Sequence, residues 1–161
     1  MIDFMVLGLP RSGTAWLANL LTTDTSLCLH ESFMHHDLKQ LDSKENPPAH
    51  KFGISETSAI FIPDEINQHS AFKIIIERPI DEINLSLYRL GLPCIDDSFV
   101  KLLKNIEGYR ISFNDLFEAS KIAEAYKLAL NKELNHERHA LLCSFGIENI
   151  YAIHAVRSMM Q

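Results

Sequence analysis

Short apolar runs alternate with amphipathic segments along the first half of the chain. Residues 2–7 and 71–77 form two such runs, and their length and flanking turns are typical of strands that are buried on both faces. The first run is followed by leucines at helical spacing up to residue 21, and the second by an apolar stripe over residues 80–90. Because strands and helices alternate, the pattern predicts an α/β fold, in which a parallel sheet of roughly four or five strands is flanked by helices.

The rest of the chain carries signals of the same kind. Two further strands are expected, at residues 26–29 and 109–113. Further helices are expected at residues 33–41, 97–107, 120–130 and 134–145. The polar, proline-containing stretch 43–51 predicts a loop, and residues 147–156 fit a strand or a helix. With 161 residues and no internal repeat, we expect a single domain over residues 1–161.

The turn after the first apolar run has the composition of an anion-binding loop. Gly8 and Gly13 lie five residues apart, with Ser12 and Thr14 beside the second glycine. A strand, a glycine turn and a helix start aim several backbone N–H groups at one point, and the helix dipole reinforces them. The lysine that nucleoside triphosphatases place after the second glycine is absent. Since Arg11 lies inside the turn instead, the pattern favours a single phosphate with a guanidinium beside it.

Composition and charge narrow the classes of function. A formal charge of −6 argues against a general nucleic-acid binder, which needs a basic face. Cys28, Cys94 and Cys143 fit neither a disulfide framework nor a zinc site, and His35 and His36 would point about 100° apart on a helix. No metal site is therefore expected. Because no basic leader and no apolar run long enough for a membrane span are found, a reduced, cytoplasmic location is the simplest expectation.

Residues 10–17 (PRSGTAWL) closely resemble the 5′-phosphosulfate loop of the sulfotransferases. These enzymes share a three-layer P-loop-type fold and use 3′-phosphoadenosine 5′-phosphosulfate (PAPS) as the sulfonate donor. The resemblance implies that the loop binds the 5′-phosphate and the sulfonate through Pro10, Arg11, Ser12, Gly13 and Thr14. It also implies that Trp16 stacks on the adenine ring, with a tryptophan packed in the core as the alternative. The family usually has a second threonine at the place of Ala15, so one hydroxyl contact is missing.

A second signature of the sulfotransferase family follows the second apolar run. The family has an arginine at a strand end and a serine eight residues later on the next helix, and both hold the 3′-phosphate. Arg78 and Ser86 have this separation, although Pro79 comes one position earlier than the usual proline. A bidentate cation and a hydroxyl donor suit a dianionic phosphate. The pair alone would indicate nothing, but downstream of a phosphosulfate-like loop it implies a PAPS site.

The candidate catalytic base comes directly after the second predicted strand. In several branches of the family a glutamate soon after the first helix takes the proton of the acceptor, and Glu31 has that placement. A carboxylate can do this if partial burial raises its pKa toward the working pH. The alternative is that His30 and Glu31 only cap the following helix. Residues 52–57 lack the lysine and proline of a G-E-K-T-P-like segment found in some members, so no role is assigned to them.

The functional hypothesis is sulfonyl transfer from PAPS to a hydroxyl or amine, with Arg11 stabilising charge on the sulfonate and Glu31 as base. One alternative is a P-loop kinase or nucleotide hydrolase, which the missing lysine disfavours. The other is an inactive relative that binds a nucleotide or a partner protein. Two features of the sequence are consistent with such an inactive relative. One is Ala15, and the other is the lack of a basic, glycine-containing segment near the C-terminus, where Arg157 alone could serve in part. The acceptor pocket is expected in variable loops, here residues 42–63; neither the acceptor nor the oligomeric state follows from the sequence.

Overall fold

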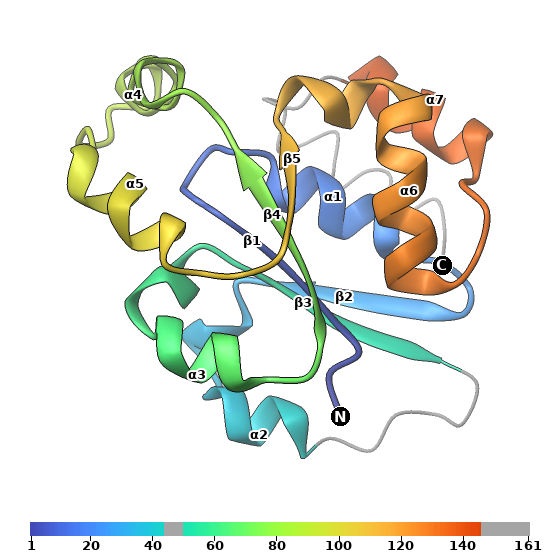
Figure 1. The fold of residues 1–161 in the computed structure, drawn as a ribbon. Helices are drawn as coiled ribbons and strands as arrows, with labels where there is room; N and C mark the ends of the chain where they lie inside the picture. Colours follow the sequence, from blue (N-terminus) through green and yellow to red (C-terminus); the bar gives the residue numbers. More distant parts are fainter. Residues whose placement is uncertain (44–49, 146–161) are drawn as a thin grey trace.

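The computed structural model describes residues 1–43 and 50–145 of the chain. In this part, five strands form a parallel sheet in the order β2-β3-β1-β4-β5, with helices on both faces (Figure 1). The strands are β1 (Phe4–Gly8), β2 (Ser26–His30), β3 (Lys51–Glu56), β4 (Phe72–Glu77) and β5 (Tyr109–Ser112). The helices are α1 (Thr14–Leu21), α2 (Leu38–Asp42), α3 (Pro63–Gln68), α4 (Ile80–Arg89), α5 (Asp97–Lys104), α6 (Ala119–Leu130) and α7 (His136–Phe145). Short 3-10 helices form η1 (Ser32–Met34), η2 (Ser58–Phe61) and η3 (Asn114–Phe117).

The central strand β1 supplies side chains to two separate cores. Phe4 and Val6 pack with residues of α1, α6 and α7 on one face of the sheet. Met5 and Leu7 pack with residues of α2, α3, α4 and α5 on the other face. Because every residue of β1 is buried, the strand must be apolar on both sides, as its sequence is. The predicted three-layer α/β arrangement is therefore confirmed.

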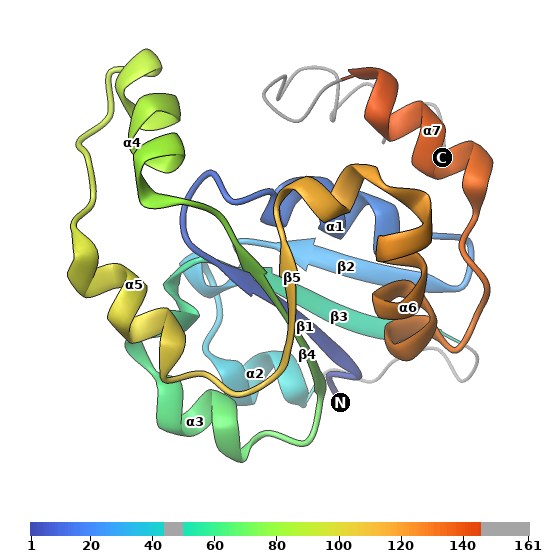
Figure 2. The same cartoon turned by 45° about the horizontal axis from the view of Figure 1, so that its top comes forward.

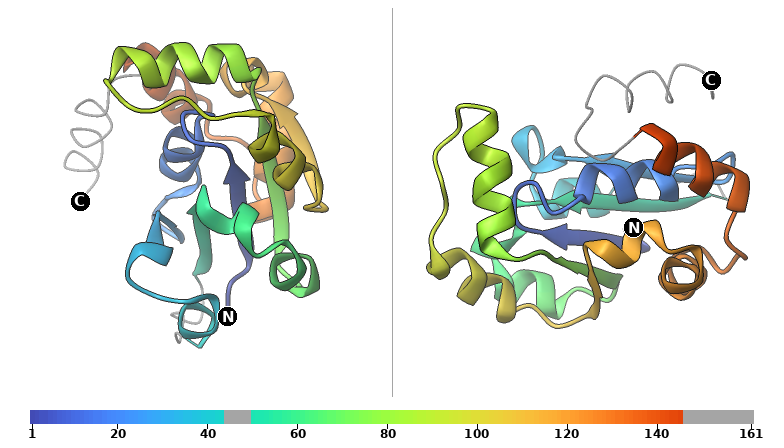
Figure 3. Two further views of the ribbon diagram at one scale, coloured as in Figure 1. Left: turned by 90° about the vertical axis from the view of Figure 1, so that its left-hand side faces the viewer. Right: turned by 90° about the horizontal axis from the view of Figure 1, so that it is seen from above.

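The carboxyl ends of the strands meet at one edge of the sheet, where ligands of open α/β folds bind. In the register of the sheet, Gly8 at the end of β1 lies opposite Ile76 of β4, and Leu7 lies opposite Glu56 of β3. Helix α4 stands beside the loop that joins β1 to α1 (Figures 2 and 3). The loop is thus flanked by β4 and α4 on one side and by β3 and β2 on the other.

Most of the predicted elements are confirmed within a few residues, but the helix at residues 33–41 is not. The helix expected at residues 33–41 is replaced by η1 and the separate helix α2. Asp37 explains the break, because its carboxylate and the side chain of Gln40 form a capping box that starts α2 there. Residues 44–49 of the predicted loop, residues 147–156 and Arg157 lie outside the described residues. Within the described ranges, no helix combines the length and the apolar character needed to cross a bilayer.

Strand β3 was not predicted, and it corrects the assignment of residues 42–63 to variable loops. Gly53 and Ser55 interrupt its apolar pattern, but both are required by the packing. A Cβ at Gly53 would lie 2.1 Å from Cε2 of Phe4, so the ring occupies the place of a side chain. Ser55 is fully buried and its Oγ donates to the carbonyl oxygen of Thr14 at 3.0 Å. Strand β3 therefore lies beside β1 and is part of the frame of the loop.

We expect Gly53→Ala to lower the free energy of unfolding by about 1–3 kcal/mol, because the new methyl group would overlap the ring of Phe4. Urea denaturation measures this loss. In the double variant with Phe4→Leu the overlap is relieved, so the combined loss should be smaller than the sum of the two single losses. Strict additivity of the two substitutions would contradict this account of the packing.

Candidate functional site

The loop between β1 and α1 folds back closely over the end of β1. A Cβ at Gly8 would lie 2.3 Å from Oγ of Ser12, so this approach requires a glycine. Arg11 and Gly13 have positive φ values of 64° and 95°, and left-handed positions of this kind turn successive N–H groups to one side. Pro10 is half-buried and contributes no N–H. Because the first turn of α1 contains no acidic residue, the positive end of its dipole remains available to an anion.

The two hydroxyl side chains of the loop are buried. Ser12 is 0% exposed, and its Oγ has no hydrogen-bond partner among the described residues. Thr14 is also buried, and its Oγ1 lies 3.4 Å from Nε2 of His30. A buried hydroxyl without a partner costs free energy. An anion oxygen bound at the loop would give Ser12 the partner that the described residues do not provide.

Arg78 and Ser86 lie beside this loop, although they are 67 and 75 residues from Arg11 in the sequence. Nη1 of Arg78 donates to the main-chain carbonyl oxygen of Arg11 at 2.7 Å. Nε of Arg11 in turn donates to Oγ of Ser86, on the buried side of α4, at 3.0 Å. The structure therefore brings the two signatures together at the carboxyl edge of the sheet. Their role in binding phosphates stays a prediction.

The guanidinium of Arg78 has further partners. Its side chain is only 9% exposed, and its Nε lies 3.2 Å from Oε2 of Glu82. Its Cζ lies 3.8 Å from the ring centroid of Phe113. An ion pair and a cation–π contact offset the cost of removing this cation from water. Because the Glu82 side chain is 42% exposed, its carboxylate can turn to solvent when another anion approaches Arg78.

Trp16 is buried among the side chains of the core. The residue is 1% exposed, and its ring centroid lies 5.6 Å from that of Phe117 and 5.7 Å from that of His139. Its Nε1 is buried without a hydrogen-bond partner among the described residues. In this structure Trp16 is a core side chain, because neighbouring rings from η3 and α7 occupy its surroundings. The burial agrees with the core alternative, and the stacking on adenine stays a prediction.

Glu31 lies on the side of the loop formed by the ends of β2 and β3. Its Oε1 accepts a hydrogen bond from Oγ1 of Thr57 at 2.8 Å and lies 3.6 Å from Nε2 of His30. Glu31 precedes η1, but its side chain makes no capping hydrogen bond there. The capping alternative is thus not observed for the Glu31 side chain. Since His30 also approaches Thr14, these side chains form a polar group that reaches the loop.

Glu56 is a candidate that the sequence reasoning missed. It ends β3 and is fully buried. Its Oε1 accepts hydrogen bonds from the N–H and Oγ of Ser32, each at 2.5 Å, and from the N–H of Phe33 at 3.1 Å. Its Oε2 is buried without a partner among the described residues. The available signal in the sequence is a carboxylate at the end of an apolar run, just before Thr57. Gly53 and Ser55 interrupt this run, so its pattern does not predict a strand.

Burial raises the pKa of Glu56 from its ordinary value of 4.5 to about 7. The negative charge of Glu31 adds to this rise, whereas the hydrogen bonds from Ser32 and Phe33 lower the pKa by stabilising the carboxylate. Glu56 therefore exchanges its proton near neutral pH, next to the candidate base. Perturbed carboxyl groups of this kind are frequent at functional sites.

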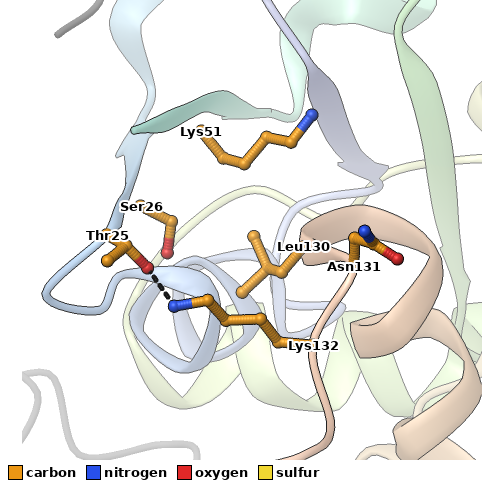
Figure 4. Close-up of a pocket in the computed structure, with 6 residues that line it drawn as sticks. All are labelled: Thr25, Ser26, Lys51, Leu130, Asn131 and Lys132. Atoms are coloured by element: carbon orange, nitrogen blue, oxygen red, sulfur yellow. Dashed lines mark hydrogen bonds between the residues drawn. The ribbon is translucent and has the colours of Figure 1, made fainter. Parts of the chain in front are cut away.

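Two hollows of the described surface lie at the opposite edge of the sheet. The first, of about 250 Å³, is lined at the starts of β2 and β3 and after α6 by Thr25, Ser26, Lys51, Leu130, Asn131 and Lys132 (Figure 4). In it, Lys132 donates to Thr25 and Lys51 pairs with Asp3 at 3.0 Å. The second, of about 420 Å³, lies at the starts of β4 and β5. Since ligands of such sheets bind at the carboxyl ends of strands, neither hollow is the candidate site.

Comparison with known proteins supports the fold. No family model matches the chain, and no curated protein matches its sequence. Among solved structures, the fold is similar to that of mouse sulfotransferase SULT7A1, crystallised in complex with PAP, with a TM-score of 0.56 and 17% sequence identity. The match covers 89% of this chain and 64% of the mouse chain, so the chain spans less than two thirds of that protein. The chain thus has a sulfotransferase-like α/β fold.

The raised pKa of Glu56 predicts a pH dependence of stability. The folded protein binds this proton more tightly than the unfolded chain, so the free energy of unfolding should fall as pH rises from 4.5 to about 7. Glu56→Gln removes the titrating group and should remove this part of the slope. Urea denaturation at several pH values measures it, with the exposed Glu65→Gln as a matched control that keeps the wild-type slope. Equal slopes in all three proteins would show that Glu56 does not titrate as described.

Proposed function

We propose that the chain binds PAPS and transfers its sulfonyl group to a hydroxyl or amine acceptor. The observation that carries this proposal is the pair of hydrogen bonds from Arg78 to Arg11 and from Arg11 to Ser86. A phosphate loop alone suits many anions, but two guanidinium groups and a hydroxyl beside it suit a ligand with a second phosphate. The similarity in fold to a sulfotransferase crystallised with PAP supports the same proposal.

The residues of the loop fit the phosphate next to the sulfonate. The N–H groups at the start of α1, with Ser12, Gly13 and Thr14, would hold the 5′-phosphate. Oγ of Ser12, which has no partner in residues 1–43 and 50–145, supports this part of the assignment. Arg78 and Ser86 would hold the 3′-phosphate, with the Ser86 hydroxyl exchanging its contact with Arg11 for a phosphate oxygen. PAPS supplies the activated sulfonyl group.

The remaining polar side chains have the chemistry that the transfer needs. Arg11 would stabilise negative charge on the sulfonate. In comparable sites one such electrostatic interaction contributes on the order of 3 kcal/mol. Glu31 would take the proton of the acceptor while the acceptor forms its bond to sulfur and the bond from sulfur to the 5′-phosphate oxygen breaks. The product nucleotide, 3′,5′-adenosine diphosphate (PAP), is then left with its phosphates at the loop and at Arg78.

A nucleotide-binding protein without transfer activity is the second candidate. The burial of Trp16 favours it, because the ring that the sulfotransferase resemblance assigns to the adenine is packed in the core. The two candidates differ in one measurement, which is transfer of radioactive sulfate from PAPS to a broad panel of hydroxyl and amine acceptors. Binding of PAP without transfer to any acceptor would favour the second candidate.

Arg78→Ala should weaken the binding of PAP roughly 10- to 100-fold, because a charged hydrogen bond to phosphate contributes about 1.5–3 kcal/mol. Isothermal titration calorimetry measures the affinity directly. Arg78→Lys keeps the charge but loses the planar fork, so its affinity should lie between those of the wild type and the alanine variant.

The matched control is Arg89→Ala, an exposed position on the same helix, which should bind PAP as the wild type does. Thermal melting of each variant establishes that it is folded, since Arg78 also supports the loop. No heat of binding with the wild-type protein, or equal affinities of wild type and Arg78→Ala, would refute the proposed function.

Glu82→Gln is expected to strengthen PAP binding. The carboxylate of Glu82 pairs with Nε of Arg78 and must give way to an incoming phosphate. Removing this partly exposed charge should favour binding by about 0.5–1 kcal/mol, which is roughly a two- to fivefold lower Kd. The effect should shrink at high salt, where the competition is screened. Weaker binding by Glu82→Gln would mean that Glu82 orients Arg78 instead of competing for it.

A further inference from the structure

A buried carboxyl group lies beside the loop and has no part in the proposed binding of phosphates. Glu56 ends β3 opposite Leu7 of β1, at the carboxyl edge of the sheet. Its Oε1 accepts three hydrogen bonds from Ser32 and Phe33, the two residues that follow Glu31. A single oxygen of Glu56 therefore holds the turn that carries the candidate base.

The same strand holds Glu31 itself. The N–H of Glu31 donates to the carbonyl oxygen of Ser55 at 2.8 Å, and its Oε1 accepts from Thr57. Glu31 has a φ of 54°, a left-handed conformation that is uncommon for glutamate and requires support from its surroundings. Residues on both sides of Glu56, together with Glu56 itself, provide that support. The backbone and the carboxylate of Glu31 are thus positioned from the end of β3.

The second oxygen of Glu56, Oε2, differs from Oε1 in its hydrogen bonding. Oε2 is buried and has no hydrogen-bond partner among the described residues. An ionised carboxylate in such a place lacks solvation on one side, whereas a proton on Oε2 removes the charge and leaves the bonds to Oε1 possible. Glu31 lies close enough for its charge to act on Glu56, and His30 lies 3.6 Å from Glu31. His35 and His36 follow η1, and their N–H groups donate to the carbonyl oxygen of Ser32. The facing residue of β1, Leu7, carries no charge.

The proposed function places further negative charge near Glu56. Oγ of Ser55, the residue before Glu56, donates to the carbonyl oxygen of Thr14, and His30 approaches the hydroxyl of Thr14. The end of β3 is thereby in direct contact with the first residue of α1. A nucleotide phosphate at the N–H groups of this loop would disfavour an ionised carboxylate nearby, because like charges repel.

Resting on the proposed function, we propose that Glu56 is a positioning residue: it anchors the turn that presents Glu31 and takes up a proton from solvent at Oε2 when the nucleotide binds. Of the two carboxyl groups, Glu56 and not Glu31 then holds the proton that is taken up. Glu31 is left to accept the proton of the acceptor. The bonds to Oε1 hold the turn in both charge states of Glu56.

Proton uptake on binding tests this role with a readout that a merely structural residue would not change. Calorimetric titration of PAP at pH 7, in two buffers with different enthalpies of ionisation, gives the number of protons taken up per nucleotide. A group that is half protonated in the free protein can take up at most about 0.5 proton, so the wild type should take up roughly 0.3–0.5 proton more than Glu56→Gln. Glu65→Gln, a carboxyl-to-amide change at an exposed position, should match the wild type.

A second measurement, made without nucleotide, tests the anchoring. Hydrogen exchange of the Ser32 and Phe33 amides should remain slow in Glu56→Gln, whose side-chain oxygen can still accept, and become about 3- to 10-fold faster in Glu56→Leu. If Glu56→Leu does not fold, Ser32→Ala takes its place. It removes one of the three donors to Oε1 and should speed exchange at Phe33 by a smaller factor.

The outcomes separate this inference from the proposed function. Equal proton uptake by wild type and Glu56→Gln, with PAP bound by both, overturns the protonation of Glu56 while the proposed function stands. Exchange of the two amides that is as slow in Glu56→Leu as in the wild type, or unchanged exchange at Phe33 in Ser32→Ala where that variant takes its place, overturns the anchoring. Absence of PAP binding by every variant and by the wild type overturns the proposed function and the proton uptake, and leaves the amide exchange to decide the anchoring.

Discussion

The hydrogen bond from the guanidinium of Arg78 to the main-chain carbonyl of Arg11 fixes the geometry of the site. An arginine side chain with 9% exposure needs compensating partners, and this one finds them in a loop carbonyl, in Glu82 and in the ring of Phe113. The carbonyl belongs to a residue with positive φ. The buried cation therefore constrains the loop conformation and the start of α4 together.

The order of the strands divides the site into two flanks, one on each side of this constrained loop. In the order β2-β3-β1-β4-β5, the loop after β1 has β4 on one side and β3 on the other. The cationic residue Arg78 follows β4, whereas the acidic residues Glu31 and Glu56 lie at the ends of β2 and β3. The proposed phosphate binding and the proposed proton transfer thereby lie on opposite flanks of the loop after β1. Such a separation places Glu31 and Glu56 on the flank opposite Arg78, whose carboxylate partner is the partly exposed Glu82.

The sequence was sufficient to predict those parts of the fold and of the candidate site that short-range patterns decide. The loop from Gly8 to Thr14 and the strand before Arg78 have signatures within a few residues, and the spacing to Ser86 follows from one helix. The sequence pattern does not predict strand β3, because Gly53 interrupts it. The ring of Phe4, from a segment far away in the chain, occupies the place of a side chain at Gly53. Trp16 is buried by Phe117 and His139, which no local pattern connects to it. Long-range packing thus decides both features.

Glu56 shows why a buried candidate carboxyl is hard to recognise before the fold is known. On the sequence it is one acidic residue in a weakly apolar stretch, and its donors Ser32 and Phe33 lie more than twenty residues earlier. Only the pairing of β3 with both β1 and β2 brings these groups together. That pairing also removes Glu56 from water, and burial is the largest cause of its raised pKa. The property that makes Glu56 a candidate is therefore created by the sheet: the same residue in a surface loop would be an ordinary carboxylate.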